Sequence, residues 1–220
     1  MDDVQKLKVF DKYLKIIKSQ TIRSFTEYVL IDIPEYFWTL PASTSGRRHG
    51  GPSETLIDHI QGCLFMAEAV CEQFDGHWKQ RQKDQLISAV IMHDGWRCGE
   101  PGYERRITQE MIDKRGYPQD KLDNLCTAPD HAEAGYRQLL RLSADFNRIA
   151  IENKEKQIAA KDLAIILKAV RYHYGPWLDI KNKPFSLDWP YSSVVMQCHN
   201  IDFHQAKNAK WWSCRRQDHE

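Results

Sequence analysis

Six residues that can bind a metal ion recur along the chain, on or beside apolar helical faces. They are His59, His93, Asp94, His131, His173 and Asp202. Neutral imidazole nitrogens and ionised carboxylate oxygens are the ligands that hold borderline and hard divalent cations. A carboxylate inside a helical bundle costs several kcal/mol of desolvation unless a partner offsets that cost, and a bound cation does so efficiently. The pattern predicts a metal site built from several helices.

The adjacent pair His93 and Asp94 is the most informative part of this pattern. It ends a strongly apolar run, residues 86–92, and packing gives no reason for such a run to end in an imidazole beside a carboxylate. Two neighbouring side chains can also serve two neighbouring ions, with His93 on one ion and Asp94 bridging both. The sequence is therefore compatible with one ion or with two.

Each of the other ligands has an ordinary explanation when it is taken alone. His59 is compatible with a hydrogen-bonded histidine at the border of a buried face. Asp202 is compatible with a solvated or salt-bridged carboxylate, and His131 with a polar residue in a first helical turn. His173 is compatible with a histidine that the helix dipole favours at a C-terminus. The joint pattern is harder to obtain by chance, so we favour the metal site.

Helices must position these side chains, and the spacing of apolar residues predicts them. The expected helices cover residues 4–18, 53–74, 83–92, 129–142, 162–174 and 191–206, with a further short element around residues 25–30. Ser53 is the expected N-cap of the helix that carries His59. Residues 34–52 are rich in Pro, Ser, Thr and Gly and are expected to be mostly loop. No convincing run of alternating strands occurs, so the predicted fold class is all-α.

Length and composition indicate one globular domain. The chain has 220 residues, of which 42% are hydrophobic and 11% aromatic, and this content argues against disorder. The formal net charge is +1 with 28% charged residues, so no global field points to nucleic acid or to a cationic partner. No apolar stretch approaches the roughly 20 residues that cross a bilayer.

Cysteine usage and the N-terminus favour a cytoplasmic protein. The six cysteines include no Cys-x-x-Cys pair, and several fall in predicted helices, so we expect reduced thiols rather than a zinc finger. The even count keeps disulfides formally open. Residues 1–5 begin acidic and lack the order of a secretory signal.

The order His, His-Asp, His, His, Asp resembles the HD-domain superfamily of metal-dependent phosphohydrolases, in its six-ligand, two-metal form. The local contexts are similar as well: residues 89–94 resemble the naming motif, 130–135 the D/G-H-x-E-x-G segment, 169–175 the R-x-H-x-G segment and 198–202 the closing aspartate helix. Residues 41–50 and the surroundings of His173 look like small stand-alone HD proteins of bacteria and phages. The resemblance covers about residues 38–205. It implies one HD-like helical domain over residues 1–220, with the helices of 1–33 and the tail of 206–220 packed on it.

The resemblance also implies a ligand set. The first divalent ion would be held by His59, His93, Asp94 and Asp202, and the second by His131 and His173 with Asp94 bridging. Mn, Fe, Mg, Ni and Co are all compatible ions. Two departures occur. Seven residues separate Gly51 from His59, where many members have three, and Trp96-Arg97 stands where the family often carries Gly-Lys.

The reaction that the resemblance implies is hydrolysis of a phosphate ester or anhydride in a nucleotide or a nucleic-acid end. A bound divalent ion lowers the pKa of its water and withdraws charge from a phosphoryl oxygen, so a metal-activated hydroxide would attack. Asp94 and Arg97 are the candidate catalytic residues, although an arginine cannot be a proton donor of tunable pKa. Arg48, His49 and Arg171 are the candidate substrate-binding residues. A solvated loop for the first two and a structural role for Arg171 are the alternatives.

Two other functions fit the same ligands. One is an HD-type di-iron oxygenase, and the other is a catalytically inactive, nucleotide-binding HD domain. The balanced charge favours a small phosphate substrate, a nucleotide, over a polynucleotide. Nucleic acid stays open because Trp211 and Trp212 with Arg215 and Arg216 could stack on bases, although packing of a terminal segment is the commoner explanation. No membrane partner is expected, and the sequence does not indicate the oligomeric state.

Overall fold

The computed structural model describes residues 1–42, 55–73, 78–174 and 192–216, and only the backbone of Arg115, Ser192 and 206–216. Within these ranges every regular element is helical, and the β-bridges that pair two described residues are isolated ones, Pro41 with Thr55 and Arg106 with Leu125. The prediction of an all-α protein is confirmed for this part of the chain.

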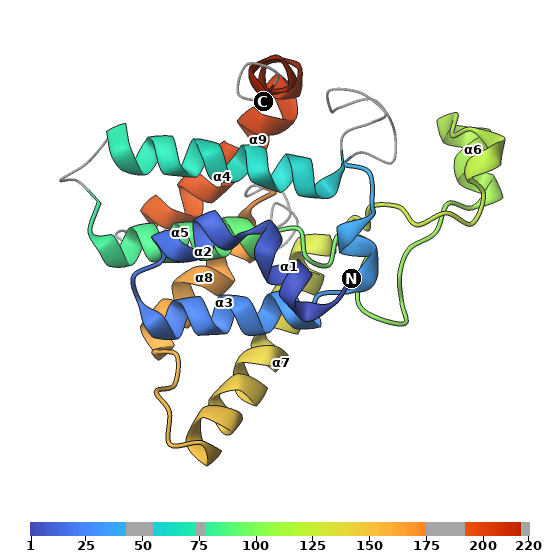
Figure 1. Cartoon of the computed structure of the whole chain (residues 1–220). Helices are drawn as coiled ribbons and strands as arrows, with labels where there is room; N and C mark the ends of the chain where they lie inside the picture. Colours follow the sequence, from blue (N-terminus) through green and yellow to red (C-terminus); the bar gives the residue numbers. More distant parts are fainter. Residues whose placement is uncertain (43–54, 74–77, 175–191, 217–220) are drawn as a thin grey trace.

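The helices follow one another through the chain with no sheet between them (Figure 1). In order they are α1 (Asp3–Val9), α2 (Asp11–Ile16), α3 (Gln20–Asp32), η1 (Glu35–Trp38), α4 (Leu56–Gln73), α5 (Gln80–Met92), α6 (Gln109–Arg115), η2 (Gln119–Lys121), α7 (His131–Glu152), α8 (Ala160–Tyr172) and α9 (Ser192–Arg216).

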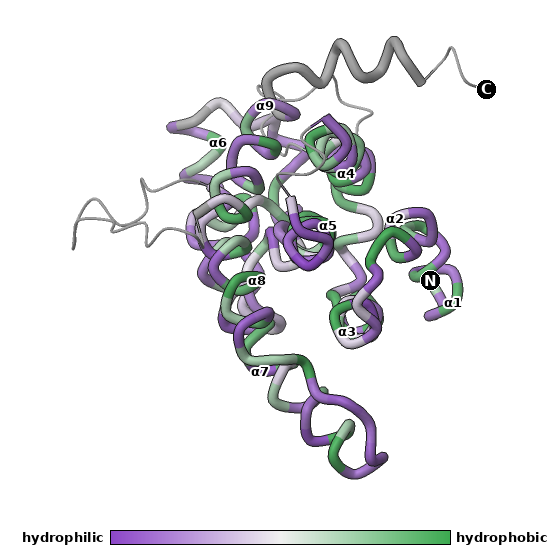
Figure 2. Tube along the Cα trace, turned by 90° about the vertical axis from the view of Figure 1, so that its left-hand side faces the viewer, coloured by the Kyte–Doolittle hydropathy of each residue, from purple (hydrophilic) through white to green (hydrophobic). Residues whose placement is uncertain are grey.

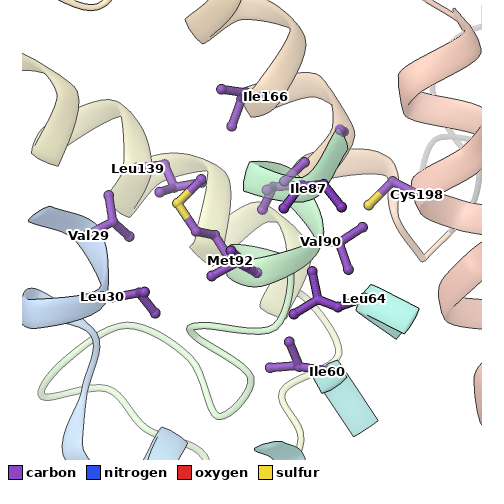
Figure 3. Close-up of a cluster of buried hydrophobic side chains, with 14 of the residues drawn as sticks. Val29, Leu30, Ile60, Leu64, Ile87, Val90, Met92, Leu139, Ile166 and Cys198 are labelled. Atoms are coloured by element: carbon purple, nitrogen blue, oxygen red, sulfur yellow. The ribbon is translucent and has the colours of Figure 1, made fainter. Parts of the chain in front are cut away.

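Helix α5 lies at the centre of the fold and packs against α2, α3, α4, α8 and α9 (Figure 1). All residues from Asp84 to Met92 are buried. A helix that is covered on every side has no polar stripe, which explains why the sequence shows a continuous apolar run here. Figure 3 shows this core, with Ile87, Val90 and Met92 of α5 and, from the surrounding helices, Val29, Leu30, Ile60, Leu64, Leu139, Ile166 and Cys198.

Buried polar contacts hold α5 in register with its neighbours. The carboxylate of Asp84 accepts hydrogen bonds from the backbone N–H groups of Lys18, at 3.0 Å, and Ser19, at 2.8 Å. Ser19 is the N-cap of α3, so Asp84 ties the start of α3 to α5. On α8, Asp162 accepts from Arg81 and from the Gln85 amide of α5. Asp84 therefore links α5 to α3, and Asp162 links α5 to α8, the helix that ends at the candidate ligand His173.

The N-terminal helix expected over residues 4–18 is in fact two helices, α1 and α2, which meet at Phe10. The backbone of Phe10 leaves the helical region there, with φ −113° and ψ 11°. The side chain of Phe10 is fully buried and packs near Phe37 and Trp38. The break lets one short segment bury apolar residues in two directions, which periodicity alone does not indicate.

Helices α7 and α9 are longer than expected. Helix α7 continues past residue 142, and the Ser143 hydroxyl donates to the Leu140 carbonyl without ending the helix. The last turns of α7 and the connection to α8 extend beyond the other helices and are largely hydrophilic (Figure 2). Helix α9 runs to Arg216, whereas the expected end was residue 206.

The segment between α5 and α7 contains two elements that the sequence did not indicate, α6 and η2. Helix α6 stands away from the main bundle (Figure 1), and its Met111 packs on a small cluster with Ile107 and Cys126. Helix α4 begins after Thr55, whose hydroxyl accepts from the Asp58 N–H while the Asp58 carboxylate accepts from the Thr55 N–H. This reciprocal pair is a capping box. The expected cap, Ser53, lies outside the described residues.

Five cysteines are buried free thiols, as expected: Cys63, Cys71, Cys98, Cys126 and Cys198. The sixth, Cys214, lies outside the described side chains. Among the described helices, none combines the length and the apolar character that a membrane span requires. The number of domains stays a prediction.

We predict that Asp84→Ala lowers the free energy of unfolding by about 2–4 kcal/mol, because two backbone N–H groups lose a charged acceptor. Urea-induced unfolding followed by circular dichroism measures this change. Asp120→Ala is the matched control, since Asp120 is exposed in η2, and its effect should stay within about 0.5 kcal/mol. Equal stabilities of the two variants would contradict the role given to Asp84.

Candidate metal centre

The six predicted ligands lie together at the C-terminal end of α5. Five helices supply them: His59 from α4, His93 and Asp94 from the turn after α5, His131 from the first turn of α7, His173 from the end of α8 and Asp202 from α9. All are buried except Asp202, whose side chain is 18% exposed. Residues more than a hundred positions apart in the sequence therefore converge on one buried polar cluster.

Asp94 lies in the middle of this cluster, and its two carboxylate oxygens face different partners. Oδ2 lies 3.7 Å from His59 Nε2 and 3.5 Å from His93 Nε2. Oδ1 lies 3.4 Å from Nε2 of both His131 and His173. No described residue donates a hydrogen bond to this buried Oδ1. A buried carboxylate oxygen among imidazole nitrogens suits a cation, so the residues fit a metal ion.

Two groups of donor atoms can be distinguished, each with its ligand atoms within 4.8 Å of one another. Group 1 consists of His59, Cys63, His93 and Asp202, and group 2 consists of Asp94, His131 and His173. In group 1, His59 Nε2 lies 3.1 Å from Asp202 Oδ1 and 3.4 Å from His93 Nε2. In group 2, the two imidazole Nε2 atoms are 3.2 Å apart. Each group could hold a metal ion.

Hydrogen bonds at Nδ1 orient all four imidazoles so that Nε2 points into the cluster. Three of the rings bond the carbonyl three residues earlier: His93 to Val90 at 2.7 Å, His131 to Ala128 at 2.8 Å and His173 to Val170 at 2.6 Å. The fourth, His59, bonds Oε1 of the buried Gln205. A carbonyl oxygen only accepts, so each Nδ1 carries a proton, and each ring presents the Nε2 lone pair when it is neutral.

The electrostatics of the cluster favour ionised carboxylates. Burial alone would raise the pKa of Asp94, but the guanidinium of Arg97 and then His93 hold that pKa well below its usual range. Burial likewise opposes the ionisation of Asp202, and hydrogen bonds with His59 and His93 lower its pKa well below the usual range. Both side chains therefore carry the charge that metal binding needs at neutral pH.

The imidazoles differ from one another in protonation. Burial lowers the pKa of His131 to about 4, so this ring is neutral at pH 7 and its lone pair is available. Burial also lowers the pKa of His93, but Asp94 and Asp202 outweigh it and the net shift is upward. These two carboxylates attract positive charge to the position of His93, which a divalent cation can supply in place of the proton.

Of the candidate catalytic and substrate-binding residues, Arg97 contacts the cluster and Arg171 lies in an ion pair on α8. The Arg97 guanidinium contacts Asp94 Oδ2, and its Nε donates to Thr127 Oγ1 at 3.2 Å. Arg171 donates to Glu133 at 2.7 Å and lies over the Tyr136 ring. It thus has a structural ion pair, and its contact with substrate stays a prediction.

The other two candidate substrate-binding residues, Arg48 and His49, lie outside the described residues. For four residues of α9 only the backbone is described: Trp211, Trp212, Arg215 and Arg216. A further histidine, His199, lies beside the cluster and bonds the backbone carbonyl of His173 at 2.7 Å. Its contact is therefore with the backbone of the candidate ligand His173 and not with its imidazole.

Three residues of the cluster were not singled out by sequence. Cys63 follows His59 by one helical turn, a spacing that places both side chains on one face, but a cysteine in an apolar stripe resembles an ordinary core residue. Gln205 and Tyr174 carry no such signal. The Tyr174 ring lies edge-on to His131 at 5.3 Å and is 44% exposed, so it stands between group 2 and solvent.

A hollow of about 400 Å³ lies next to the start of α7. Its lining includes Arg105, Arg137, Glu100 and Tyr103 but none of the donor atoms. Arg137 is paired with Glu100, and Arg105 bonds the Thr127 carbonyl, so both cations are already engaged. This hollow adds no ligand to the metal centre.

Comparisons of the chain with protein-family models, with curated proteins and with solved structures find no match. The structure shows an all-helical fold in its described residues and two buried groups, rich in His and Asp, that could bind metal. The resemblance to the HD superfamily rests on the motifs alone.

We predict that Gln205→Leu lowers the metal affinity of group 1 by about 10–100-fold, because His59 loses the acceptor that orients its ring. Competition with a chelating dye measures the affinity of the first and second equivalents of Zn²⁺. Gly62→Ala should lower the same affinity, because its new Cβ would lie 2.7 Å from Gln205 Nε2 and would push the amide away from His59.

Gln138→Leu is the control for that measurement. Gln138 lies on α7 and bonds Glu100, outside both groups. Unchanged Zn²⁺ binding in Gln205→Leu, or an equal loss in Gln138→Leu, would show that Gln205 does not orient His59.

Proposed function

We propose that this protein is a metal-dependent phosphohydrolase of the HD type, which cleaves a phosphate ester or anhydride of a nucleotide. The observation that carries the proposal is the position of Asp94. One of its oxygens faces His59 and His93, and the other faces His131 and His173. A carboxylate shared in this way is the arrangement that two-metal hydrolytic sites use to hold two cations close together.

The chemistry that such ions supply is known in general terms. Bound divalent cations lower the pKa of a water molecule and neutralise charge on a phosphoryl oxygen, which makes hydrolysis feasible at neutral pH. The protein's own part is to hold the ions and to exclude other ligands. Burial of the cluster below 5% exposure for His59, His93 and Asp94 supports this role, because a low-dielectric surrounding strengthens each electrostatic contact.

Arg97 is our candidate for binding the phosphate. Its guanidinium lies against Asp94 Oδ2, and its side chain is 12% exposed, so it borders both the cluster and the approach to it. A planar fork of N–H donors matches phosphate oxygens, and Thr127 fixes the orientation of the fork through Nε. We assign to Arg97 the binding and orientation of the phosphoryl group beside Asp94. Because an arginine does not release its proton, the leaving group must take its proton from another donor.

The charge of the chain supports a small substrate. The formal net charge is +1, and the two arginines that line the hollow beside the start of α7 are already engaged, Arg137 with Glu100 and Arg105 with the Thr127 carbonyl. A polynucleotide would require a continuous run of unpaired cations along its backbone. A nucleotide needs only the cations beside the metal centre.

We predict that the protein, stripped of metal and reloaded with Mn²⁺, Mg²⁺, Ni²⁺ or Fe²⁺, releases phosphate or a nucleotide product from a panel of nucleotides. Asp94→Asn should lower kcat at least about 100-fold, because the bridging charge is lost while the shape is kept. Colorimetric phosphate detection and chromatography of the nucleotides measure both results.

Asp120→Asn is the control, since this carboxylate is exposed in η2 and belongs to neither donor group. Full activity in Asp94→Asn would remove the basis of the proposal. So would the absence of any product with every metal and substrate, or oxygen uptake by the Fe²⁺-loaded protein with no phosphate release. The last result would assign the site to the oxygenase alternative.

A further inference from the structure

Group 1 contains a sulfur atom in addition to the imidazoles and carboxylate that the motifs indicate. Cys63 lies in α4, one turn after His59, and its Sγ is 3.7 Å from His59 Nε2. The side chain is fully buried. Its Sγ lies within 4.8 Å of the ligand atoms of His59, His93 and Asp202. Three other donors therefore converge on the same point as this thiol.

We propose that the Cys63 sulfur is a ligand of the ion in group 1, and that group 1 consequently selects a thiophilic cation such as Zn²⁺, Co²⁺ or Fe²⁺ over Mg²⁺. Thiolate is a soft ligand, whereas Mg²⁺ takes oxygen ligands almost exclusively. This inference rests on the metal site of the proposed function and specifies the class of ion that it uses.

The distances in group 1 agree with a shared ion. For metal–nitrogen and metal–oxygen bonds of roughly 2.0–2.2 Å and a metal–sulfur bond of roughly 2.3 Å, a tetrahedron has edges of about 3.3–3.6 Å. The observed separations are 3.1 Å for His59–Asp202, 3.4 Å for His59–His93, 3.6 Å for His93–Asp202 and 3.7 Å for His59–Cys63. The nitrogen and oxygen donors at these spacings can meet one ion after shifts of a few tenths of an ångström. The Cys63 sulfur lies within 4.8 Å of all three of them, so it joins the ion by a rotation or small shift of its own side chain.

The charge balance also permits a thiolate here. Coordination forms the metal–sulfur bond and releases the thiol proton to solvent, and a divalent cation in contact with sulfur stabilises the anion. With one thiolate and one carboxylate from group 1, the cation is neutralised without help from the bridging Asp94.

Cys198 provides the matched comparison. It is buried, lies in α9 four residues before Asp202, and borders the same region of the core. Its sulfur nevertheless falls outside the donor group formed by the described residues. Cys63 and Cys198 are thus similarly buried, but only Cys63 has its sulfur among the donor atoms of group 1.

The test is titration of the metal-free full-length protein with Co²⁺, followed by absorption spectroscopy. The wild type should develop a strong thiolate-to-cobalt charge-transfer band in the near ultraviolet, together with the weaker visible bands of bound Co²⁺. Cys63→Ser should lose the near-ultraviolet band and bind the first equivalent at least about tenfold more weakly. Cys198→Ser should keep the band and the affinity.

Several outcomes overturn the inference. A wild-type protein that binds Co²⁺ without the charge-transfer band would show that no sulfur is a ligand, and this result does not depend on any variant folding. Retention of the band in a Cys63→Ser or Cys63→Ala protein that circular dichroism shows to be folded would mean that another sulfur binds the cobalt ion. In both cases the metal site of the proposed function stands. Failure to bind Co²⁺ or any other divalent ion would instead remove the proposed function itself.

Discussion

The structure depends on the burial of one carboxylate. Asp94 is 2% exposed at the end of the central helix, and an ionised group in such a position requires compensating charge and hydrogen-bond donors. Arg97 supplies part of that compensation at Oδ2. The remaining surroundings are imidazoles whose Nε2 atoms point at the carboxylate, and Oδ1 has no hydrogen-bond partner among the described residues. The arrangement is consistent with selection for a bound cation, which satisfies the carboxylate and the imidazoles together.

The helix ends provide the means of orienting these imidazoles. Helix termini leave backbone carbonyls without a partner inside the helix. His93 and His173 each follow the last residue of a helix and return Nδ1 to such a carbonyl, and His131 does the same with the turn that precedes α7. One local geometry, used three times, fixes the tautomer of three rings. The packing of α5 against α8 then brings two of those ends together.

The two donor groups are chemically unequal. Group 1 combines nitrogen, oxygen and sulfur donors, and its imidazole His59 is held by a side chain, Gln205. Group 2 combines two imidazoles with the shared carboxylate, and burial keeps His131 neutral down to about pH 4. Ions in the two positions would therefore differ in affinity, and the shared oxygens of Asp94 would couple them. A site of this kind is adjusted by the residues around each ion as well as by the bridge.

The sequence by itself determined the helical class, the central apolar helix and the six candidate ligands, because residue type and hydrophobic period are local properties. It also indicated reduced thiols for the five described cysteines. Tertiary structure alone decided the break at Phe10, the length of α7 and the entry of Cys63 and Gln205 into the cluster. Sequence spacing carries no distance between helices: His59 and Gln205 are 146 residues apart, yet their side chains are hydrogen-bonded. Only the packing of α4 against α9 creates that contact, since neither helix encodes the position of the other.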